Sequence, residues 1–357
     1  MPIFSQPDFD NHEAVHAFYD AATKLKGFIA IHSTARGAAF GGCRIWPYAD
    51  EDAAVRDALR LSRGMSYKNA LAELAYGGGK AVIIGDPAHI KSSALFEAFG
   101  RVVQSLAGRY ITAEDVGTTV DDMRAVARTT QYVSGIPQDT GYQGGDPSPR
   151  TARGVYEGMR AAARVALDRD DLRGLTVAVQ GAGNVGYHLC RYLHEAGANL
   201  VVADIHAQNT SRTVREFGAT ACAPDEILTT QADVLAPCAL GGVLNRDTIK
   251  SLRVKVVAGA ANNQLATAAD GERLHKRSIV YAPDYVINAG GIISVAAERD
   301  QTVDGDEVMA RIMRTYDRTL ELLQRARDLN YPPHEVAEEL AREIIGKAQA
   351  ASQMAAA

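Results

Sequence analysis

The sequence predicts an α/β fold of two domains, the second of which contains a doubly wound parallel sheet. Short apolar runs alternate with longer helical patterns through most of the chain. The 357 residues are enough for about two domains. The glycine-rich segment GAGNVG, at residues 181–186, follows an apolar run and opens a helical pattern. Together these observations predict an N-terminal α/β domain followed by a Rossmann-type domain, with a cleft between them.

The N-terminal half has three apolar runs of strand length with helical patterns between them. We expect strands at 28–31, 81–84 and 109–112 and helices at 51–74, 91–106 and 121–127. Residues 135–149 concentrate Gly, Pro, Asp and Ser, which is typical of a loop or hinge. We therefore expect the first domain to span residues 1–135.

The alternation becomes more regular in the second half. Strands are expected at 175–180, 200–203, 234–236, 255–258 and 279–281, and helices at 151–167, 185–195, 306–327 and 334–348. Units of this length indicate a parallel sheet wound in both directions. The second domain is expected to span 136–330, a terminal helix at 331–350 to pack back on the first domain, and the last residues, AASQMAAA, to form a frayed tail.

Composition excludes several functional classes. Lys and Arg number 38 against 43 Asp and Glu, and this net charge of −5 argues against a nucleic-acid partner. The four cysteines form no C-x-x-C pair, which argues against a disulfide framework and a structural zinc site and favours the cytoplasm. Neither a signal-peptide pattern nor an apolar stretch of membrane-spanning length is found, so no membrane association is expected. HEAVH at 12–16 fits a zinc motif, but no third ligand lies nearby, and no metal is expected.

The glycines of GAGNVG point to a dinucleotide. Gly181, Gly183 and Gly186 permit a tight turn and let the backbone approach a pyrophosphate at the positive end of a helix. A second apolar run ends in Asp204, which can accept hydrogen bonds from the adenosine ribose hydroxyls. The same carboxylate would repel a 2′-phosphate and no arginine follows it, so the sequence favours NAD over NADP.

A second cluster of glycine-rich segments carries two lysines, Lys68 in GMSYK and Lys80 in GGGK. GGGK is not a phosphate loop, because the spacing and the hydroxyl residue of that motif are missing. If both lysines face one cavity, charge repulsion and desolvation would drive one of them towards neutrality, so that it could act as a base. From spacing alone, two merely solvated lysines remain the other interpretation. Asn262 and Asn288 also lie beside glycines, where they serve either in turns or as ligand contacts.

The ordered motifs resemble a known family. GGCRIWPY, ALRLSRGMSYKNA, GGGKAVIIGDP, RYITAEDVGT, VAVQGAGNVG, APCALGGVLN, VAGAANNQL and YAPDYVINAGG follow one another across residues 25–300 as they do in leucine dehydrogenases, within the glutamate, leucine, phenylalanine and valine dehydrogenase superfamily. The resemblance implies that an L-amino acid, NAD and water give the 2-oxo acid, ammonium and NADH. It also implies a homo-oligomer.

The resemblance also implies roles for individual residues. Lys80 would be the catalytic base, Asp115 would assist proton transfer, and Lys68 would bind the substrate carboxylate. A neutral lysine and a carboxylate that exchanges protons with it are what this chemistry requires. Further substrate contacts would be Gly42, Asn262 and Asn288. The cofactor contacts would be Arg44, Thr151, Gly181, Ala182, Gly183, Asn184, Val185, Gly186, Asp204, Cys238, Ala239 and Asn262.

The side-chain pocket of the family corresponds to apolar residues in this chain: Phe40, Ala113, Ile292 and Val295. Glutamate dehydrogenases carry a lysine where this chain has Phe40, and a substrate carboxylate left unpaired there would be too costly. We therefore expect Leu, Val or Ile as substrate. Phenylalanine or tryptophan is the alternative, and a 2-hydroxy acid dehydrogenase or an NAD-binding sensor without turnover is a more distant one.

Overall fold

The computed structural model describes residues 2–136, 146–300 and 303–356. Contacts within the chain separate two compact units. Unit 1 comprises Met1–Gly145, Val295–Asp304 and Ala341–Ala357, and unit 2 comprises Asp146–Ser294 and Gly305–Leu340. The loop or hinge expected at 135–149 lies largely outside the described residues, so the domain limits expected from the sequence stay predictions.

Unit 1 contains a mixed six-stranded sheet. Its strands are β1 (Ala14–Asp20), β2 (Leu25–Ser33), β3 (Ala39–Phe40), β4 (Cys43–Trp46), β5 (Gly77–Ile84) and β6 (Tyr110–Ile111). They are ordered β1-β2-β5-β3-β6, and β4 also pairs with β5. Strand β5 is antiparallel to β2 and parallel to β3 and β4, so it is held on both sides.

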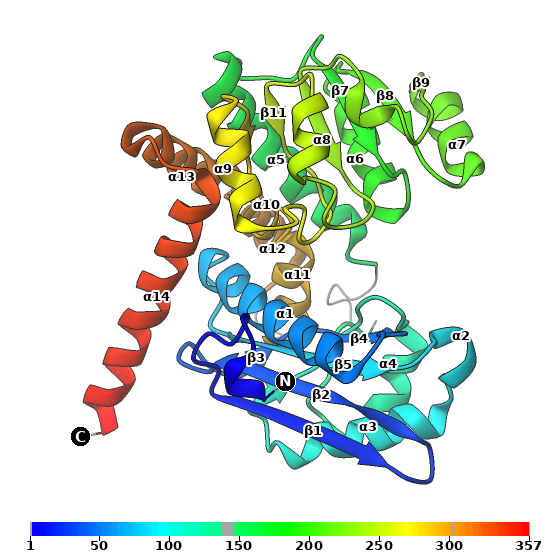
Figure 1. The fold of residues 1–357 in the computed structure, drawn as a ribbon, viewed down its shortest axis with the longest axis vertical. Helices are drawn as coiled ribbons and strands as arrows, with labels where there is room; N and C mark the ends of the chain where they lie inside the picture. Colours follow the sequence, from blue (N-terminus) through cyan, green and yellow to red (C-terminus); the bar gives the residue numbers. More distant parts are fainter. Residues whose placement is uncertain (1, 137–145, 301–302, 357) are drawn as a thin grey trace. The chain divides into compact units, whose positions relative to one another are not determined.

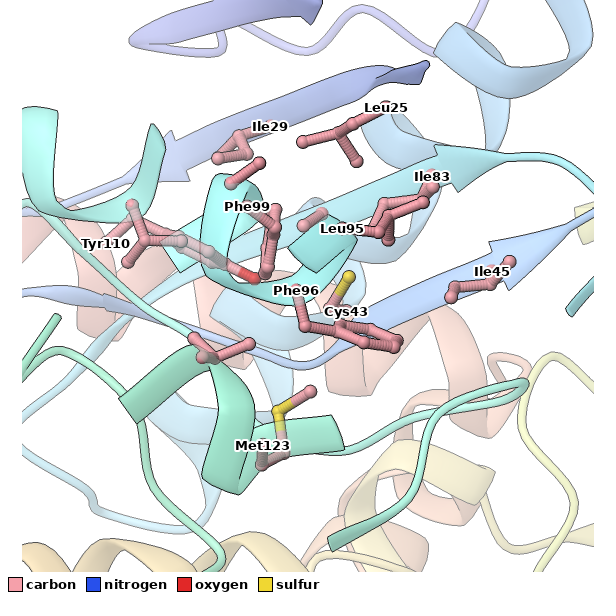
Figure 2. Close-up of a cluster of buried hydrophobic side chains, with 14 of the residues drawn as sticks. Leu25, Ile29, Cys43, Ile45, Ile83, Leu95, Phe96, Phe99, Tyr110 and Met123 are labelled. Atoms are coloured by element: carbon pink, nitrogen blue, oxygen red, sulfur yellow. The ribbon is translucent and has the colours of Figure 1, made fainter. Parts of the chain in front are cut away.

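Helices cover both faces of this sheet (Figure 1). On one face, Ala30 and Val82 pack against α1 (Glu51–Leu71). On the other, Ile29 and Ile83 pack against α3 (Ser93–Ser105) and α4 (Val120–Ala127), where Phe96, Phe99 and Met123 complete the core (Figure 2). A short helix, α2 (Pro87–Ile90), follows β5. Because side chains alternate along a strand, Lys80 shares the α1 face with Val82.

Unit 2 contains a six-stranded sheet that is parallel throughout. Its strands are β7 (Thr176–Gln180), β8 (Asn199–Ala203), β9 (Thr220–Ala221), β10 (Val234–Pro237), β11 (Val256–Val257) and β12 (Val280–Tyr281). The order β12-β11-β10-β7-β8-β9 is the doubly wound Rossmann arrangement, so the predicted fold class is confirmed. The strand order reverses between β7 and β10, where such sheets bind ligands.

Helices precede, connect and follow these strands. They are α5 (Ser148–Leu167), α6 (Asn184–Glu195), α7 (Ala207–Phe217), α8 (Arg246–Ser251), α9 (Ala268–Lys276), α10 (Asp284–Ile287), α12 (Gly305–Met313) and α13 (Thr315–Leu329). Two more helices, α11 (Gly290–Asp300) and α14 (Pro333–Ala356), contribute residues to both units. The core between sheet and helices includes Ala178, Leu235, Val257 and Tyr281.

Two sequence-based expectations about elements are wrong. The helix expected at 306–327 is interrupted at Arg314, between α12 and α13. The tail expected to fray continues α14 as far as Ala356, because alanine is the best helix former. In HEAVH, His16 lies in β1 and His12 precedes it, so the two imidazoles do not share a helix face.

Candidate active site

The centre of unit 1 is an ion pair between Lys80 and Asp115. Lys80 lies in the middle of β5 and is only 4% exposed, and Asp115 lies in the loop that follows β6. The Nζ atom of Lys80 is 3.1 Å from Oδ2 of Asp115. Backbone pairing of Lys80 with Ala30 on β2, and of the adjacent Ala81 with Cys43 on β4, fixes the position of the lysine.

Glycines allow the approach of the segments that carry this pair. A Cβ on Gly42 would lie 2.7 Å from the carbonyl oxygen of Glu114 and 2.8 Å from Cβ of Asp115. A Cβ on Gly78 would lie 2.0 Å from the backbone nitrogen of Ser66 on α1. The glycine-rich segments of unit 1 therefore bring β5, α1 and the Asp115 loop together.

The electrostatic surroundings perturb both groups. Burial lowers the pKa of Lys80, the nearby Arg44 charge lowers it further, and Asp115 opposes both effects. Burial alone would raise the pKa of Asp115, but the charges of Lys80 and Arg44 outweigh it and hold this pKa well below its usual range. The geometry thus provides a lysine that gives up its proton readily beside a carboxylate that stays ionised.

Arg44 connects this pair to helix α1. Its Nε donates to Oδ2 of Asp115 at 3.0 Å, and its Nη1 donates to Oδ2 of Asp57 on α1 at 3.0 Å. The hydroxyl of Tyr48 donates to the same Asp57 oxygen at 2.6 Å. Sequence reasoning missed both Asp57, which lies outside the quoted motifs, and Tyr48, which ends GGCRIWPY but received no role there. A contact between Arg44 and a dinucleotide stays a prediction.

Lys68 and the expected pocket residues of unit 1 lie around this centre. Lys68 is half-buried in the last turn of α1. Phe40 on β3 is completely buried, and its ring meets that of Tyr76 edge-on at 5.1 Å between centroids. The Tyr76 hydroxyl donates to Asp300 at 2.6 Å. Ala113 is also buried.

The expected glycine loop of unit 2 lies where the strand order reverses. Gly181 ends β7 with φ +93°, and a Cβ there would lie 2.9 Å from Cβ of Ala239 in the segment after β10. A Cβ on Gly186 would lie 1.9 Å from the carbonyl oxygen of Gly181. A Cβ on Gly183 would meet nothing within 4 Å. Gly181 and Gly186 are thus required by close packing, whereas Gly183 leaves the backbone accessible to a ligand.

Asp204 holds this loop from the end of β8. Its Oδ2 accepts the backbone N–H of Ala182 at 2.7 Å, and its Oδ1 accepts that of His206 at 2.8 Å. Helix α6 begins after Gly183 with no side-chain cap, so its first N–H groups are available to an anion. These features fit the pyrophosphate and ribose of a dinucleotide.

Polar side chains beyond β11 form a second group in unit 2. Asn288, buried, donates to Oδ1 of the exposed Asn262 at 2.9 Å and to the carbonyl oxygen of Ala260 at 3.1 Å. Its own Oδ1 is buried and has no hydrogen-bond partner among the residues that the structure describes. Thr151 lies in the first turn of α5, where its Oγ1 is 2.8 Å from the position of a Cβ on Gly291. The two asparagines expected at the substrate therefore lie together.

The structure divides the sequence-predicted site residues between the units. Unit 1 holds Phe40, Gly42, Arg44, Lys68, Lys80, Ala113, Asp115 and Val295. Unit 2 holds Thr151, Gly181, Ala182, Gly183, Asn184, Val185, Gly186, Asp204, Cys238, Ala239, Asn262, Asn288 and Ile292. Within unit 2, Cys238 and Ala239 contact the glycine loop. Ile205 and Leu240, adjacent in sequence to Asp204 and Ala239, are 82% and 78% exposed, a signal that sequence alone could not give.

The described ranges contain neither a cluster of side chains suited to a metal ion nor a membrane-spanning helix. Among those residues, His, Cys, Asp and Glu side chains do not gather in groups of three suited to a metal ion. The helices in the same ranges include none with the length and apolar character needed to cross a membrane.

Comparison with known proteins agrees with this architecture. Residues 13–132 match the family model described as "Glu/Leu/Phe/Val dehydrogenase, dimerisation domain", and residues 146–207 and 202–351 match "Glutamate/Leucine/Phenylalanine/Valine dehydrogenase". The chain is 51% identical over 348 residues to leucine dehydrogenase of Bacillus subtilis (strain 168), covering 97% of this chain and 94% of the relative. It is 49% identical over 345 residues to valine dehydrogenase of Streptomyces virginiae, covering 96% of each chain.

Among solved structures, tryptophan dehydrogenase from Nostoc punctiforme matches with a TM-score of 0.80 and 43% identity, covering 95% of this chain and 97% of that one. The parallel sheet with its glycine loop, and the buried lysine–aspartate pair, define an oxidoreductase built from two α/β units. The chain belongs to the Glu/Leu/Phe/Val dehydrogenase family and is an amino-acid dehydrogenase, which confirms the resemblance seen in its motifs.

Proposed function

We propose that this dehydrogenase catalyses the reversible, NAD-dependent oxidative deamination of an apolar L-amino acid to its 2-oxo acid and ammonium. The observation that carries this proposal is the buried Lys80–Asp115 pair, with 3.1 Å between Nζ and Oδ2, in a chain 51% identical to a leucine dehydrogenase. Lys80 is the base, the ionised Asp115 assists its proton transfer, and Lys68 binds the substrate carboxylate.

The chemistry needs a lysine that can be neutral. Hydride leaves the α-carbon only when the substrate amine is deprotonated, since its lone pair then forms the C=N bond of an iminium. Neutral Lys80 removes a proton from water while the water oxygen attacks the iminium carbon. The lysine ammonium then returns a proton to the nitrogen, and Lys80, neutral again, takes the hydroxyl proton as the C–N bond breaks, so that ammonia leaves and the 2-oxo acid remains. The lowered pKa of Lys80 supports this role.

NAD, when bound, accepts the hydride at its nicotinamide ring. In unit 2 the open backbone at Gly183 and the uncapped start of α6 suit the pyrophosphate. The carboxylate of Asp204 would accept from the ribose hydroxyls and repel a 2′-phosphate. The exposed side chains of Ile205 and Leu240 provide apolar cover for the adenine.

Further cofactor contacts are assigned by the resemblance. Thr151 would bind the nicotinamide carboxamide, and Asn262 would lie near the nicotinamide and the substrate. The remaining contacts are those of the glycine loop, Ala182, Asn184, Val185, Cys238 and Ala239.

The substrate class follows from the apolar residues that we expect to line the side-chain pocket. Phe40, fully buried beneath Tyr76, offers no partner to a substrate carboxylate, so glutamate is excluded on desolvation cost. Ala113, Ile292 and Val295 would complete the pocket, with Asn288 near the substrate amine and Gly42 at its carboxylate. Leu, Val and Ile are the proposed substrates. The 43% identity to a tryptophan dehydrogenase supports an aromatic substrate as the second candidate.

A homo-oligomer is also proposed. It is supported by the match of residues 13–132 to a family model described as a dimerisation domain. The cytoplasmic location expected from the cysteines stays a prediction.

The test is a substrate and cofactor panel. Purified protein is assayed for NADH or NADPH formation at alkaline pH with L-Leu, L-Val, L-Ile, L-Phe, L-Trp, L-Glu and L-lactate. NADH formation with the aliphatic amino acids supports the proposal, and preference for Phe or Trp supports the second candidate. Turnover of glutamate alone would contradict the proposed apolar side-chain pocket. Turnover of lactate alone would contradict the proposed oxidative deamination.

A further inference from the structure

The Lys80–Asp115 pair is one end of a longer charge network. A single oxygen, Oδ2 of Asp115, receives both Nζ of Lys80 at 3.1 Å and Nε of Arg44 at 3.0 Å. The same guanidinium reaches Oδ2 of Asp57 at 3.0 Å, and Tyr48 donates to that oxygen at 2.6 Å. Strand β5, strand β4, the Asp115 loop and helix α1 each contribute one charged group.

We propose that Arg44, held by Asp57 and Tyr48, is a positioning residue that keeps Asp115 ionised and in place while Lys80 gives up its proton. The inference rests on the proposed role of Lys80 as the base. It assigns to Arg44, Asp57 and Tyr48 functions in the reaction that act through Asp115.

The need for a second cation follows from burial. The side chains of Lys80 and Asp115 are 5% and 16% exposed. When Lys80 becomes neutral, it no longer stabilises the negative charge of the buried Asp115. Without another cation beside it, Asp115 would have a raised pKa and would tend to bind the proton itself. The guanidinium of Arg44 stays charged at any working pH, and its planar fork can hold two carboxylates in a fixed geometry. Asp115 thus keeps a charged partner in both states of the lysine.

Asp57 and Tyr48 fix Arg44 from the other side. The Arg44 side chain is 17% exposed, so its charge also requires a partner, and Asp57 on α1 provides one. Tyr48 donates its hydroxyl to Asp57 and orients that carboxylate. With Lys80 protonated, Lys80 and Arg44 carry two positive charges and Asp115 and Asp57 carry two negative charges. The net charge of the cluster is then zero.

The surroundings of Lys80 contribute few other charges. Cys43 and Tyr110, which lie close, stay neutral because burial raises the pKa of each. Lys68 lies in the last turn of α1. The charges with the largest effects on the pKa of Lys80 are those of Asp115, Arg44 and Asp57.

Arg44 and Asp57 act on Lys80 with opposite signs. The Arg44 charge lowers the pKa of Lys80 and the Asp57 charge raises it. Deamination requires neutral Lys80, so kcat/KM rises with pH as the lysine is deprotonated. Loss of Arg44 should move this rise to higher pH, and loss of the Asp57 charge should move it to lower pH. A purely structural role would not produce opposite shifts.

The experiment measures kcat/KM for the preferred amino acid against pH in the full-length protein. Arg44→Gln is expected to move the rise of kcat/KM, the acid limb of the profile, to higher pH by about 0.5 to 1 unit. Asp57→Asn is expected to move it to lower pH by a similar amount. Arg44→Lys should restore the limb position but not kcat, because an ammonium keeps the charge and loses the fork. Arg128→Gln is the matched control, since its 2.9 Å pair with Glu97 is exposed and joins α4 to α3; this variant should leave the limb unmoved.

Shifts in the same direction for Arg44→Gln and Asp57→Asn, or lost activity with no shift in either, would overturn the inference. If Arg44→Gln fails to fold, Arg44→Lys and Asp57→Asn still test the positioning role of Arg44. Failure of the proposed function has a different signature. In that case the unmodified protein oxidises no amino acid, or Lys80→Ala is as active as the unmodified protein.

Discussion

Nζ of Lys80 lies 3.1 Å from Oδ2 of Asp115, and the lysine is almost completely removed from solvent. Neutralising the carboxylate should therefore impair proton exchange while the fold persists. Asp115→Asn keeps the shape of the side chain, and we expect kcat to fall by about 10²- to 10⁴-fold. Steady-state NADH formation measures this fall, and thermal unfolding serves as the check on folding. An Asp115→Asn enzyme with normal kcat would show that the pair is structural.

The two glycines that flank the start of α6 should respond differently to alanine. At Gly183 a Cβ meets nothing within 4 Å, so Gly183→Ala should fold normally and bind NAD at least about tenfold more weakly, because the methyl group occupies the path of the pyrophosphate. At Gly186 a Cβ would lie 1.9 Å from a carbonyl oxygen, so Gly186→Ala should lose about 1 to 3 kcal/mol of stability. Calorimetry and NADH fluorescence titration separate the two effects. Equal NAD affinity in Gly183→Ala and the unmodified protein would contradict the proposed pyrophosphate position.

Asp204 should determine the choice between NAD and NADP. It accepts two backbone N–H groups and is the negative charge at the end of β8. Asp204→Asn keeps an acceptor oxygen for the loop and removes the charge, so we expect the preference for NAD over NADP, as a ratio of kcat/KM values, to fall by about tenfold or more. A ratio that does not change would remove the basis for assigning the ribose to Asp204.

Phe40 should limit the size of the substrate side chain. Its buried ring lies against Tyr76, and a smaller residue would enlarge the pocket. Phe40→Leu is expected to raise kcat/KM for Leu relative to Val by about threefold to tenfold, since one methylene in an apolar pocket has effects of that order. Competition assays with the two amino acids provide the ratio. If it stays the same, Phe40 does not line the pocket.

His32 should make stability depend on pH. Its Nδ1 lies 2.8 Å from Oγ of Ser66 on α1, and burial is the main reason why its pKa falls from 6.5 to about 4. Between these values the unfolded chain binds a proton that the folded chain does not, so the free energy of unfolding falls as the pH drops from about 6.5 to 4. This group alone accounts for about 2 to 3 kcal/mol. His32→Asn keeps a polar group near Ser66 and cannot titrate, so its denaturant midpoint should decline less over that interval. Parallel declines would exclude His32 as the cause.

Most of the core elements could be predicted from the sequence. The place where the strand order of unit 2 reverses could be predicted from GAGNVG after one apolar run and Asp204 after the next, because both signals are local. Helix α7 was missed, since it buries only Thr213 and few of its residues are apolar. Strand β1 was missed because its side chains are half-buried or exposed. Such edge and surface elements depend on tertiary contacts that no short window contains.

The environment of Lys80 could not be predicted in the same way. Lys80, Asp115 and Arg44 each lie in a recognisable motif, but Asp57 is one of several acidic residues on a helix and Tyr48 follows a proline in a loop. Their partnership depends on the parallel register of β4 beside β5, in which Arg44 pairs with Val82, and on the position of α1 over the sheet. Pairings between residues distant in sequence appear only when the strands are assembled.

The central claim is that Lys80 is the base of an amino-acid dehydrogenase, and one comparison tests it most directly. Lys80→Ala and, as its control, Lys26→Ala, which removes an exposed lysine of β2, are assayed for NADH formation and for NADH binding. Lys80→Ala is expected to lose at least about 10²-fold in kcat while binding NADH normally, and Lys26→Ala is expected to match the unmodified enzyme. Turnover by Lys80→Ala at the rate of the unmodified enzyme would contradict the claim.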